Sequence, residues 1–139
     1  ALRRTDIQAQ LDPQLDDVLL EPESIYDALL NLVTNAIDAV PDGQAGKVII
    51  RAQRIPDQNN FKIEVLDNGA GIPEPVRDKV FNLFFSTKGK RGTGIGLAAT
   101  KKIIEDHSGT IEFDTTLGQG TCFRVYLPLK PAGFPPAAT

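Results

Sequence analysis

The spacing of apolar residues switches between a helical and a strand period several times along this chain, and that succession limits its folds. From Pro22 to about Val40, apolar residues recur at helical intervals, which predicts an amphipathic helix. Residues alternate between apolar and polar within 48–52 and 61–65, which predicts two strands joined as a hairpin through 56–60. The apolar face of the helix is expected to comprise Leu29, Leu32, Val33, Ala36 and Val40.

Short connections join most of the expected strands, so the sheet should be mixed but mostly antiparallel, with helices on one face. The predicted fold class is therefore α+β, a two-layer sandwich. A second helix is expected from about Gly94 to Glu105 or Asp106. The other expected elements are strands at 7–11, 18–20, 111–113 and 123–127, a short helix at 73–80 and a loop at 81–91.

Composition supports one globular domain. The chain has 139 residues, of which 41% are hydrophobic, so it can bury a core of its own. We expect the domain to span 1–128 and the Pro- and Ala-rich residues 129–139 to form a tail or linker. The chain contains no methionine, so we expect it to be a fragment of a longer protein. Because the sequence shows no dimerisation helices, we expect this fragment to be monomeric.

Charge and cysteine usage narrow the partners and the compartment. The net charge of −3 argues against nucleic acid as the main partner. No segment has the roughly 18 apolar residues that a membrane span needs, so no direct membrane contact is expected. One cysteine, Cys122, fits a reducing cytoplasm and is interpreted as a small half-buried side chain in a strand. With one cysteine and one histidine, a zinc site is not expected.

Three polar residues, Asn31, Asn35 and Asp38, lie at i, i+4 and i+7 in the first expected helix and therefore share one side of it. A solvated stripe that also includes Ser24 and Asp27 is the alternative interpretation. Asparagine is a poor residue for the middle of a helix because its side chain competes for backbone hydrogen bonds. A stripe that is merely solvated would more often use Glu or Lys, so a ligand-binding role and a solvated surface stay open together.

Asp67 closes the second predicted strand and has the parity of the apolar residues before it. Its carboxylate should therefore point to the buried side of the sheet, where a charge needs a partner. In Asp67-Asn68-Gly69-Ala70-Gly71 the glycines would allow backbone to approach a flat ligand closely. A carboxylate there could accept a hydrogen bond from the adenine amino group and would repel the guanine carbonyl. A simple strand-ending turn is the alternative interpretation.

Residues 92–96, Gly-Thr-Gly-Ile-Gly, precede the second expected helix. They match neither the Walker A loop nor the dinucleotide fingerprint, since the required Gly-Lys-Ser/Thr run and third glycine are absent. A glycine loop that feeds a helix N-terminus can still bind phosphate. Lys88, Lys90 and Arg91 stand just before it, and a charged surface loop is the alternative, more so for Lys90 than for Lys88.

Two further features are ambiguous alone. Gly118-Gln119-Gly120-Thr121 is typical of a hairpin turn, and Thr121 becomes a candidate adenine contact only beside the other motifs. His107 would be tempting as a phosphoacceptor, but it lies at the expected end of a helix, where an interaction with the last carbonyls is the better interpretation.

In this order and spacing the motifs resemble the catalytic ATP-binding domain of bacterial two-component sensor histidine kinases. That family belongs to the superfamily of gyrase, the ninety-kilodalton heat-shock chaperones and mismatch-repair ATPases. The resemblance covers about residues 7–128. The matched segments are the N box at 31–36, the first Gly box at 67–73, the F box at 81–88, the second Gly box at 92–97 and the last Gly box at 118–121. The short loop from Lys88 to Gly92 is most similar to kinases of the nitrogen-regulation type.

The resemblance implies the Bergerat ATP-binding fold, with ATP and Mg²⁺ as cofactors. Asn35 would ligate Mg²⁺, Asp67 would bind adenine and residues 85–92 would form the ATP lid. The implied catalytic residues are Asn31, Asn35 and Lys88. The implied cofactor-binding residues are Asn35, Asp67, Gly69, Gly71, Ile72, Lys88, Arg91, Gly92, Thr93, Gly94, Ile95, Gly96, Leu97 and Thr121.

Asn31 separates a kinase from a hydrolase. Hydrolysing members of the superfamily carry a Glu four residues before the metal-binding Asn, and an amide cannot take a proton from water at neutral pH. The resemblance therefore implies transfer of the γ-phosphoryl group to a His on separate dimerisation and phosphoacceptor helices of a parent phosphoprotein. A response regulator would be the indirect partner.

Three alternatives stay open at this point: an ATP hydrolase of the same superfamily, a nucleotide-dependent regulatory module, and a Ser/Thr kinase of the anti-sigma type.

Asp38 departs from the family, since many relatives have Lys or His at this position. Lys88 or Arg91 would then supply the phosphate contact, and Asp38, if near the metal, could hold a Mg²⁺-bound water.

Overall fold

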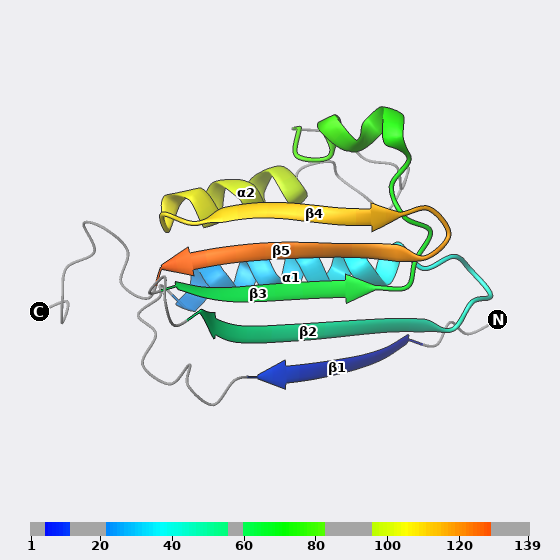
Figure 1. Ribbon diagram of the computed structural model, residues 1–139, viewed down its shortest axis with the longest axis horizontal. Helices are drawn as coiled ribbons and strands as arrows, with labels where there is room; N and C mark the ends of the chain where they lie inside the picture. The colour runs from blue at the N-terminus through cyan, green and yellow to red at the C-terminus, as the bar shows by residue number, and fades with distance from the viewer. Residues whose placement is uncertain (1–4, 12–21, 56–59, 83–95, 129–139) are drawn as a thin grey trace, which may run out of the picture.

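The computed structural model describes residues 5–11, 22–55, 60–82 and 96–128 (Figure 1). The order of elements agrees with the sequence prediction wherever both can be compared. The predicted strand at 18–20, the tail at 129–139 and most of the loop at 81–91 lie outside the described residues. The elements are β1 (Thr5–Leu11), α1 (Pro22–Asp38), β2 (Gly46–Ile55), β3 (Asn60–Asp67), the 3₁₀ helix η3 (Glu74–Lys79), α2 (Gly96–Asp106), β4 (Thr110–Thr116) and β5 (Gly120–Pro128).

Among the described residues, five strands form one sheet in the order β1-β2-β3-β5-β4. β1 is parallel to β2, and the other three neighbouring pairs are antiparallel, which confirms the mixed, mostly antiparallel sheet. The parallel pair follows from the chain order, because α1 lies between β1 and β2 and a crossover through a helix returns the chain in the same direction. Both α-helices lie on the same side of the sheet, behind the strands in Figure 1.

The core fills the space between the helices and the covered face of the sheet. On β3 and β5, alternate residues are buried, as the apolar alternation predicts. On α1 the buried stripe includes Ile25 and Ala28 as well as the predicted Leu32 and Ala36, while Leu29 and Val33 are only partly buried. Val40 is buried as predicted but lies just beyond the end of α1. The apolar spacing thus identified the helix correctly and placed the centre of its buried face slightly too far round.

An aromatic cluster joins the turn after η3 to the sheet. The ring of Phe81 packs edge-on against Phe113 and Phe123, with centroid distances of 6.0 and 6.2 Å. The Lys101 ammonium on α2 lies 5.4 Å from the centroid of the Phe81 ring, a cation–π contact. Phe81 is therefore fixed both to the strands and to α2, which ties the end of η3 to the second helix.

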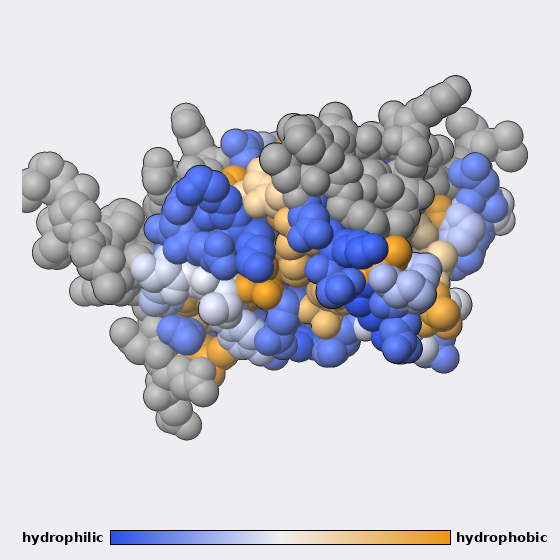
Figure 2. All heavy atoms as spheres, turned by 90° about the horizontal axis from the view of Figure 1, so that it is seen from above, coloured by the Kyte–Doolittle hydropathy of each residue, from blue (hydrophilic) through white to orange (hydrophobic). Residues whose placement is uncertain are grey.

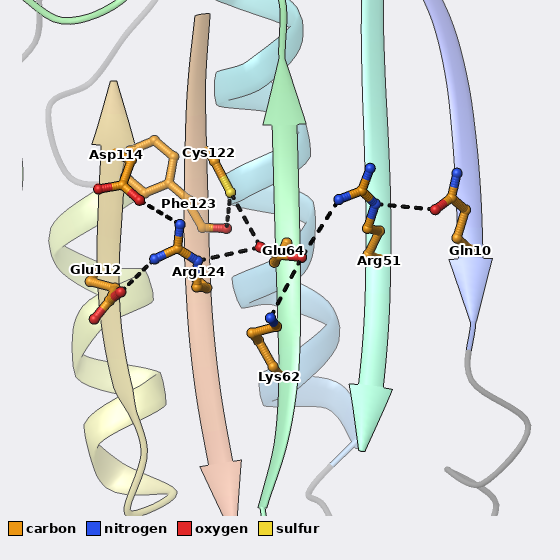
Figure 3. Close-up of polar contacts among 9 residues, drawn as sticks. All are labelled: Gln10, Arg51, Lys62, Glu64, Glu112, Asp114, Cys122, Phe123 and Arg124. Atoms are coloured by element: carbon orange, nitrogen blue, oxygen red, sulfur yellow. Dashed lines mark hydrogen bonds and ion pairs between the residues drawn. The ribbon is translucent and has the colours of Figure 1, made fainter. Parts of the chain in front are cut away.

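The face of the sheet opposite the helices carries a row of polar side chains that crosses all five strands (Figure 3). Strand register places Gln10, Arg51, Glu64, Arg124 and Glu112 side by side in that order. Hydrogen bonds or ion pairs join adjacent members, from Arg51 Nε and Gln10 Oε1 at 3.1 Å to Arg124 Nη1 and Glu112 Oε2 at 2.5 Å. We call these five residues the open-face row.

Arg124 is the centre of this row. Its guanidinium contacts Asp114, Glu112 and Glu64, and the hydrogen bonds to these carboxylates, first of all to Asp114, raise the pKa of Arg124. Cys122 is half-buried in β5 beside Glu64, as the sequence interpretation expected. Burial, and then the Glu64 charge, raise the pKa of the Cys122 thiol above its usual 9.0. The thiol is therefore held in its neutral form.

Figure 2 views the molecule from above, the side on which β4, α2 and η3 lie in Figure 1. Hydrophilic residues cover much of the coloured surface there, and hydrophobic residues form small areas between them. Lys102 and Asp106 on α2 form an exposed i, i+4 ion pair at 3.3 Å. Pairs of this kind contribute little to stability, so Lys102 and Asp106 add little to the folding free energy.

Candidate functional site

Asp67, the last residue of β3, lies on the covered face of the sheet, as its parity predicts. Its register partners are Val48 on β2 and Thr121 on β5. The Oδ1 atom accepts hydrogen bonds from the Gly69 N–H at 2.8 Å and the Thr121 N–H at 3.3 Å. The Oδ2 atom is buried and takes no part in either bond. Backbone donors thus fix the carboxylate at the edge of the core.

The loop after Asp67 is held by three other elements. The Asn68 side chain accepts from the Lys47 N–H at 2.8 Å and donates to the Ala45 carbonyl at 3.1 Å. The Ala70 N–H donates to the Ala39 carbonyl at the end of α1, and the Ala70 carbonyl accepts from the Gly118 N–H. Asn68 and Ala70 therefore tie the loop to β2, to α1 and to the β4–β5 turn.

The two glycines of this loop are required by packing. A Cβ at Gly69 would lie 2.5 Å from the Ala39 carbonyl oxygen, and one at Gly71 would lie 2.6 Å from the Thr116 carbonyl oxygen. Gly71 also has a φ of +81°, a conformation that favours glycine. The fold alone thus accounts for glycine at both positions, and the ligand contact expected there is a separate prediction.

Two threonines lie beside Asp67 on the covered face of the sheet. Thr121 is opposite Asp67 in register, and Thr115 on β4 is opposite Thr121. Their hydroxyl oxygens are 2.9 Å apart. Thr115 Oγ1 also accepts from the Ile72 N–H at 2.9 Å and donates to the Gly120 carbonyl at 3.2 Å. We call Asp67, Thr121 and Thr115 the covered-face row.

The polar stripe of α1 runs beside this site. The Asn31 amide donates to the carbonyl of Gly96, the first residue of α2, at 3.4 Å. The Ala39 carbonyl, two helical turns further on, accepts from Ala70. Asn35 is partly buried and lies midway, at i+4 from Asn31. Its side chain is therefore on the part of α1 between the start of α2 and the glycine loop.

Thr100 reinforces the start of α2. Its side chain is fully buried, and its hydroxyl donates to the Gly96 carbonyl at 2.8 Å, so that carbonyl has two side-chain donors. Gly96 and Leu97 themselves are partly exposed at this helix end. The predicted phosphate-binding residues Lys88, Arg91, Gly92, Thr93, Gly94 and Ile95 lie outside the described residues.

The structure also assigns the remaining candidates. His107 is buried at the end of α2, and its Nδ1 lies 2.9 Å from the Ile103 carbonyl, which confirms the predicted interaction with the last turn of the helix.

Within 5–11, 22–55, 60–82 and 96–128, no group of three acidic, histidine or cysteine side chains lies close enough together to bind a metal ion. Across those same ranges, none of the helices has the length and apolar character needed to cross a membrane.

Sequence reasoning missed three residues that shape the site: Asn68, Thr100 and Thr115. Asn68 was within the quoted motif, but the signal there is shared with any strand-ending turn. Thr115 and Thr100 belong to no motif, and only the pairing register and the helix contact reveal their roles.

This arrangement brings an inward carboxylate, a glycine loop, an asparagine stripe and a helix N-terminus to one end of the molecule. Residues 21–131 match the family model described as histidine kinase-, DNA gyrase B- and HSP90-like ATPase. The chain belongs to this family. Its five-stranded mixed sheet with helices on one face is the α+β fold of histidine kinase catalytic domains.

Among curated relatives, the sensory histidine kinase/phosphatase NtrB of Vibrio alginolyticus is 32% identical over 131 residues, 88% of this chain and 37% of NtrB. The chain spans as little as 17% of other curated relatives. Among solved structures, the catalytic domain of histidine kinase ThkA matches with a TM-score of 0.75 at 35% identity, over 89% of this chain and 78% of that one. Full-length ShkA in complex with AMPPNP matches with a TM-score of 0.78 at 27% identity, over 89% of this chain and 25% of that one.

Proposed function

We propose that this domain binds Mg²⁺-ATP and donates the γ-phosphoryl group to a histidine on a separate phosphoacceptor domain of its parent sensor kinase. The observation that carries the proposal is the carboxylate of Asp67, which faces inward and is fixed by two backbone donors at the edge of the core. In a chain of this family, such a carboxylate is suited to accept a hydrogen bond from the exocyclic amino group of adenine. Guanine has a carbonyl at that position and would be repelled.

The donor set fits Mg²⁺ bound together with a nucleotide. Mg²⁺ keeps several waters and takes one or two protein oxygens plus substrate phosphates, so the single amide oxygen of Asn35 is a sufficient protein ligand. Bound Mg²⁺ would neutralise phosphate charge. We propose phosphate contacts from Lys88, Arg91 and residues 92–97, because this segment leads into α2, which begins at Gly96 and whose N-terminus favours an anion.

Asn31 favours phosphoryl transfer over hydrolysis. Its amide has no basic group for activating water, and its Nδ2 donates to the Gly96 carbonyl in the structure. A site without a general base would protect ATP from water and leave the phosphoryl group for a nucleophile brought by another domain. Catalysis would then rest on positioning and charge neutralisation.

The proposed partners follow from the relatives, which are longer kinases of which this chain spans only 17% to 37%. The parent's dimerisation and phosphoacceptor helices would supply the histidine, and a response regulator would receive the phosphoryl group in a two-component system. We propose a cytoplasmic location for the domain, where ATP is available.

Calorimetric titration of this chain with ADP and a non-hydrolysable ATP analogue, with and without Mg²⁺, tests the binding step. We expect Mg²⁺-linked binding that Asp67→Asn weakens strongly without unfolding the domain. Asn35→Ala should keep nucleotide binding but lose its dependence on Mg²⁺. Unchanged affinity in Asp67→Asn would remove the adenine assignment, and Mg²⁺ dependence retained in Asn35→Ala would move the metal ligand elsewhere.

Labelled ATP, added with a phosphoacceptor-helix fragment in trans, tests the transfer step. Acid-labile, base-stable label on the helices supports the histidine kinase. Free phosphate without labelled helices would indicate a hydrolase, acid-stable label a Ser/Thr kinase, and neither product a regulatory module.

A further inference from the structure

We infer that Thr115 is a positioning residue for base selection. It orients the Thr121 hydroxyl so that this hydroxyl offers only lone pairs to a ligand that approaches the Asp67 carboxylate. This inference rests on the proposed function, because it concerns the recognition of the same nucleotide base. Thr115 belongs to no motif of the chain, and its role depends on the hydrogen bonds of the covered-face row.

The first step is to count donors and acceptors around Thr115. A hydroxyl has one proton to donate and two lone pairs. The Ile72 N–H, 2.9 Å from Thr115 Oγ1, can only donate, so it occupies one lone pair. The Gly120 carbonyl, 3.2 Å away, can only accept, so it takes the Thr115 proton. One lone pair of Thr115 remains.

The second step is that this lone pair meets the Thr121 hydroxyl, 2.9 Å away. Thr121 can donate or accept, but the Thr115 proton is already engaged. The arrangement that satisfies all three neighbours therefore has Thr121 donating to Thr115. Because Thr121 is only 6% exposed, its hydroxyl is held within this network instead of turning freely toward solvent.

The third step concerns what is left for a ligand. With its proton directed at Thr115, Thr121 has lone pairs alone for a group that approaches Asp67, its partner across β3 and β5. The Asp67 carboxylate also accepts only. The two side chains then form a surface of acceptors, which suits an exocyclic amino group and disfavours a carbonyl at the same ring position. Thr115 thereby sharpens the preference for a 6-aminopurine over a 6-oxopurine.

The test compares Mg²⁺-ADP with Mg²⁺-IDP, whose base has a carbonyl in place of the 6-amino group, by titration calorimetry. Thr115→Val should lower the ratio of ADP to IDP affinity by about threefold to tenfold, because Thr121 regains a free proton. Thr115→Ser keeps the hydroxyl and should restore the ratio. Thr116→Val, on the neighbouring exposed position of β4, should match the wild type.

A purely structural role for Thr115 would lower both affinities equally, and an unchanged ratio would overturn the inference. Thr121→Val gives a second test if Thr115→Val does not fold, as judged by circular dichroism. Removing an acceptor should weaken ADP and spare IDP, whereas loss of IDP binding would show that Thr121 donates and would overturn the inference.

Asp67→Asn separates this inference from the proposed function. If that variant binds ADP like the wild type, or the wild type binds no nucleotide, the proposed function fails and this inference fails with it. If Asp67→Asn loses ADP while Thr115→Val keeps the wild-type ratio, only this inference fails.

Discussion

Glu64 and Asp67 are three residues apart on β3 and face opposite sides of the sheet, each within a polar row that crosses several strands. In the open-face row, Glu64 lies between Arg51 and Arg124, so carboxylates and cations alternate. In the covered-face row, Asp67 is held by backbone N–H groups and continues into two threonine hydroxyls. The first row balances its own charge. The second gathers acceptors, and we infer that it is built to meet a donor from outside the chain.

Exchanging each carboxylate for its amide tests this contrast most directly. Asp67→Asn should weaken ADP binding by about tenfold to a hundredfold, the value of a charge-assisted hydrogen bond, with a small change in melting temperature. Glu64→Gln should bind ADP like the wild type and melt at a lower temperature, because Arg124 and Arg51 lose a charged partner. Calorimetry and thermal denaturation measure both variants. The contrast would be wrong if the two variants behaved alike.

Gly69→Ala should destabilise the domain by about 1–3 kcal/mol, because the new methyl group overlaps the Ala39 carbonyl and α1 must shift. Chemical denaturation gives the free energy of unfolding. Gly96→Ala is the matched control, since no atom of the described residues lies within 4 Å of a Cβ there and alanine favours a helix. Equal stability of the two variants would contradict the close packing of the glycine loop on α1.

Arg124→Met should lower the free energy of unfolding by about 1–2 kcal/mol, because Glu64, Glu112 and Asp114 would face one another without their shared cation. Nucleotide affinity should not change. Lys102→Met, which breaks the exposed pair with Asp106, should cost less than about 0.5 kcal/mol in the same denaturation experiment. A larger loss in the Lys102 variant would show that the open-face row is not a stabilising network.

The smallest expected effect is a dependence of stability on pH through Cys122. The folded pKa of this thiol is raised above 9.0, so the unfolded chain releases the proton first as the pH rises. The contribution of Cys122 is therefore complete below about pH 9 and is lost as the pH rises through the folded pKa. Urea unfolding at neutral and alkaline pH should show a steeper loss for the wild type than for Cys122→Ala. Parallel curves would exclude this linkage.

Periodicity in the sequence predicted the face of the sheet on which Asp67 lies. Phe61, Ile63 and Val65 alternate, and extending that alternation to Asp67 placed its carboxylate on the covered face. Thr115 could not be found in this way, because its position opposite Thr121 depends on the length of the turn that joins β4 to β5. The sequence predicted a mixed sheet but did not identify β1 and β2 as neighbours, since the pattern within a strand does not show which strand lies beside it.

The open-face row illustrates the same limit. Gln10, Arg51, Glu64, Arg124 and Glu112 are scattered along the sequence and match no motif, yet strand register aligns them. Alternation indicated that these side chains face away from the core. Which of them meet depends on which strands are neighbours and on the register of each pair, and the pattern within a single strand gives neither.

The hydrogen bonds of the glycine loop have a consequence for amide exchange with solvent deuterium. The N–H groups of Gly69, Ala70 and Ile72 donate to Asp67, to the end of α1 and to Thr115 on β4, respectively. Each amide can exchange only when its own acceptor moves away. Three residues within four positions of the chain thus serve as separate probes of a strand end, a helix end and a hairpin. Their individual exchange rates would show which of those elements opens first.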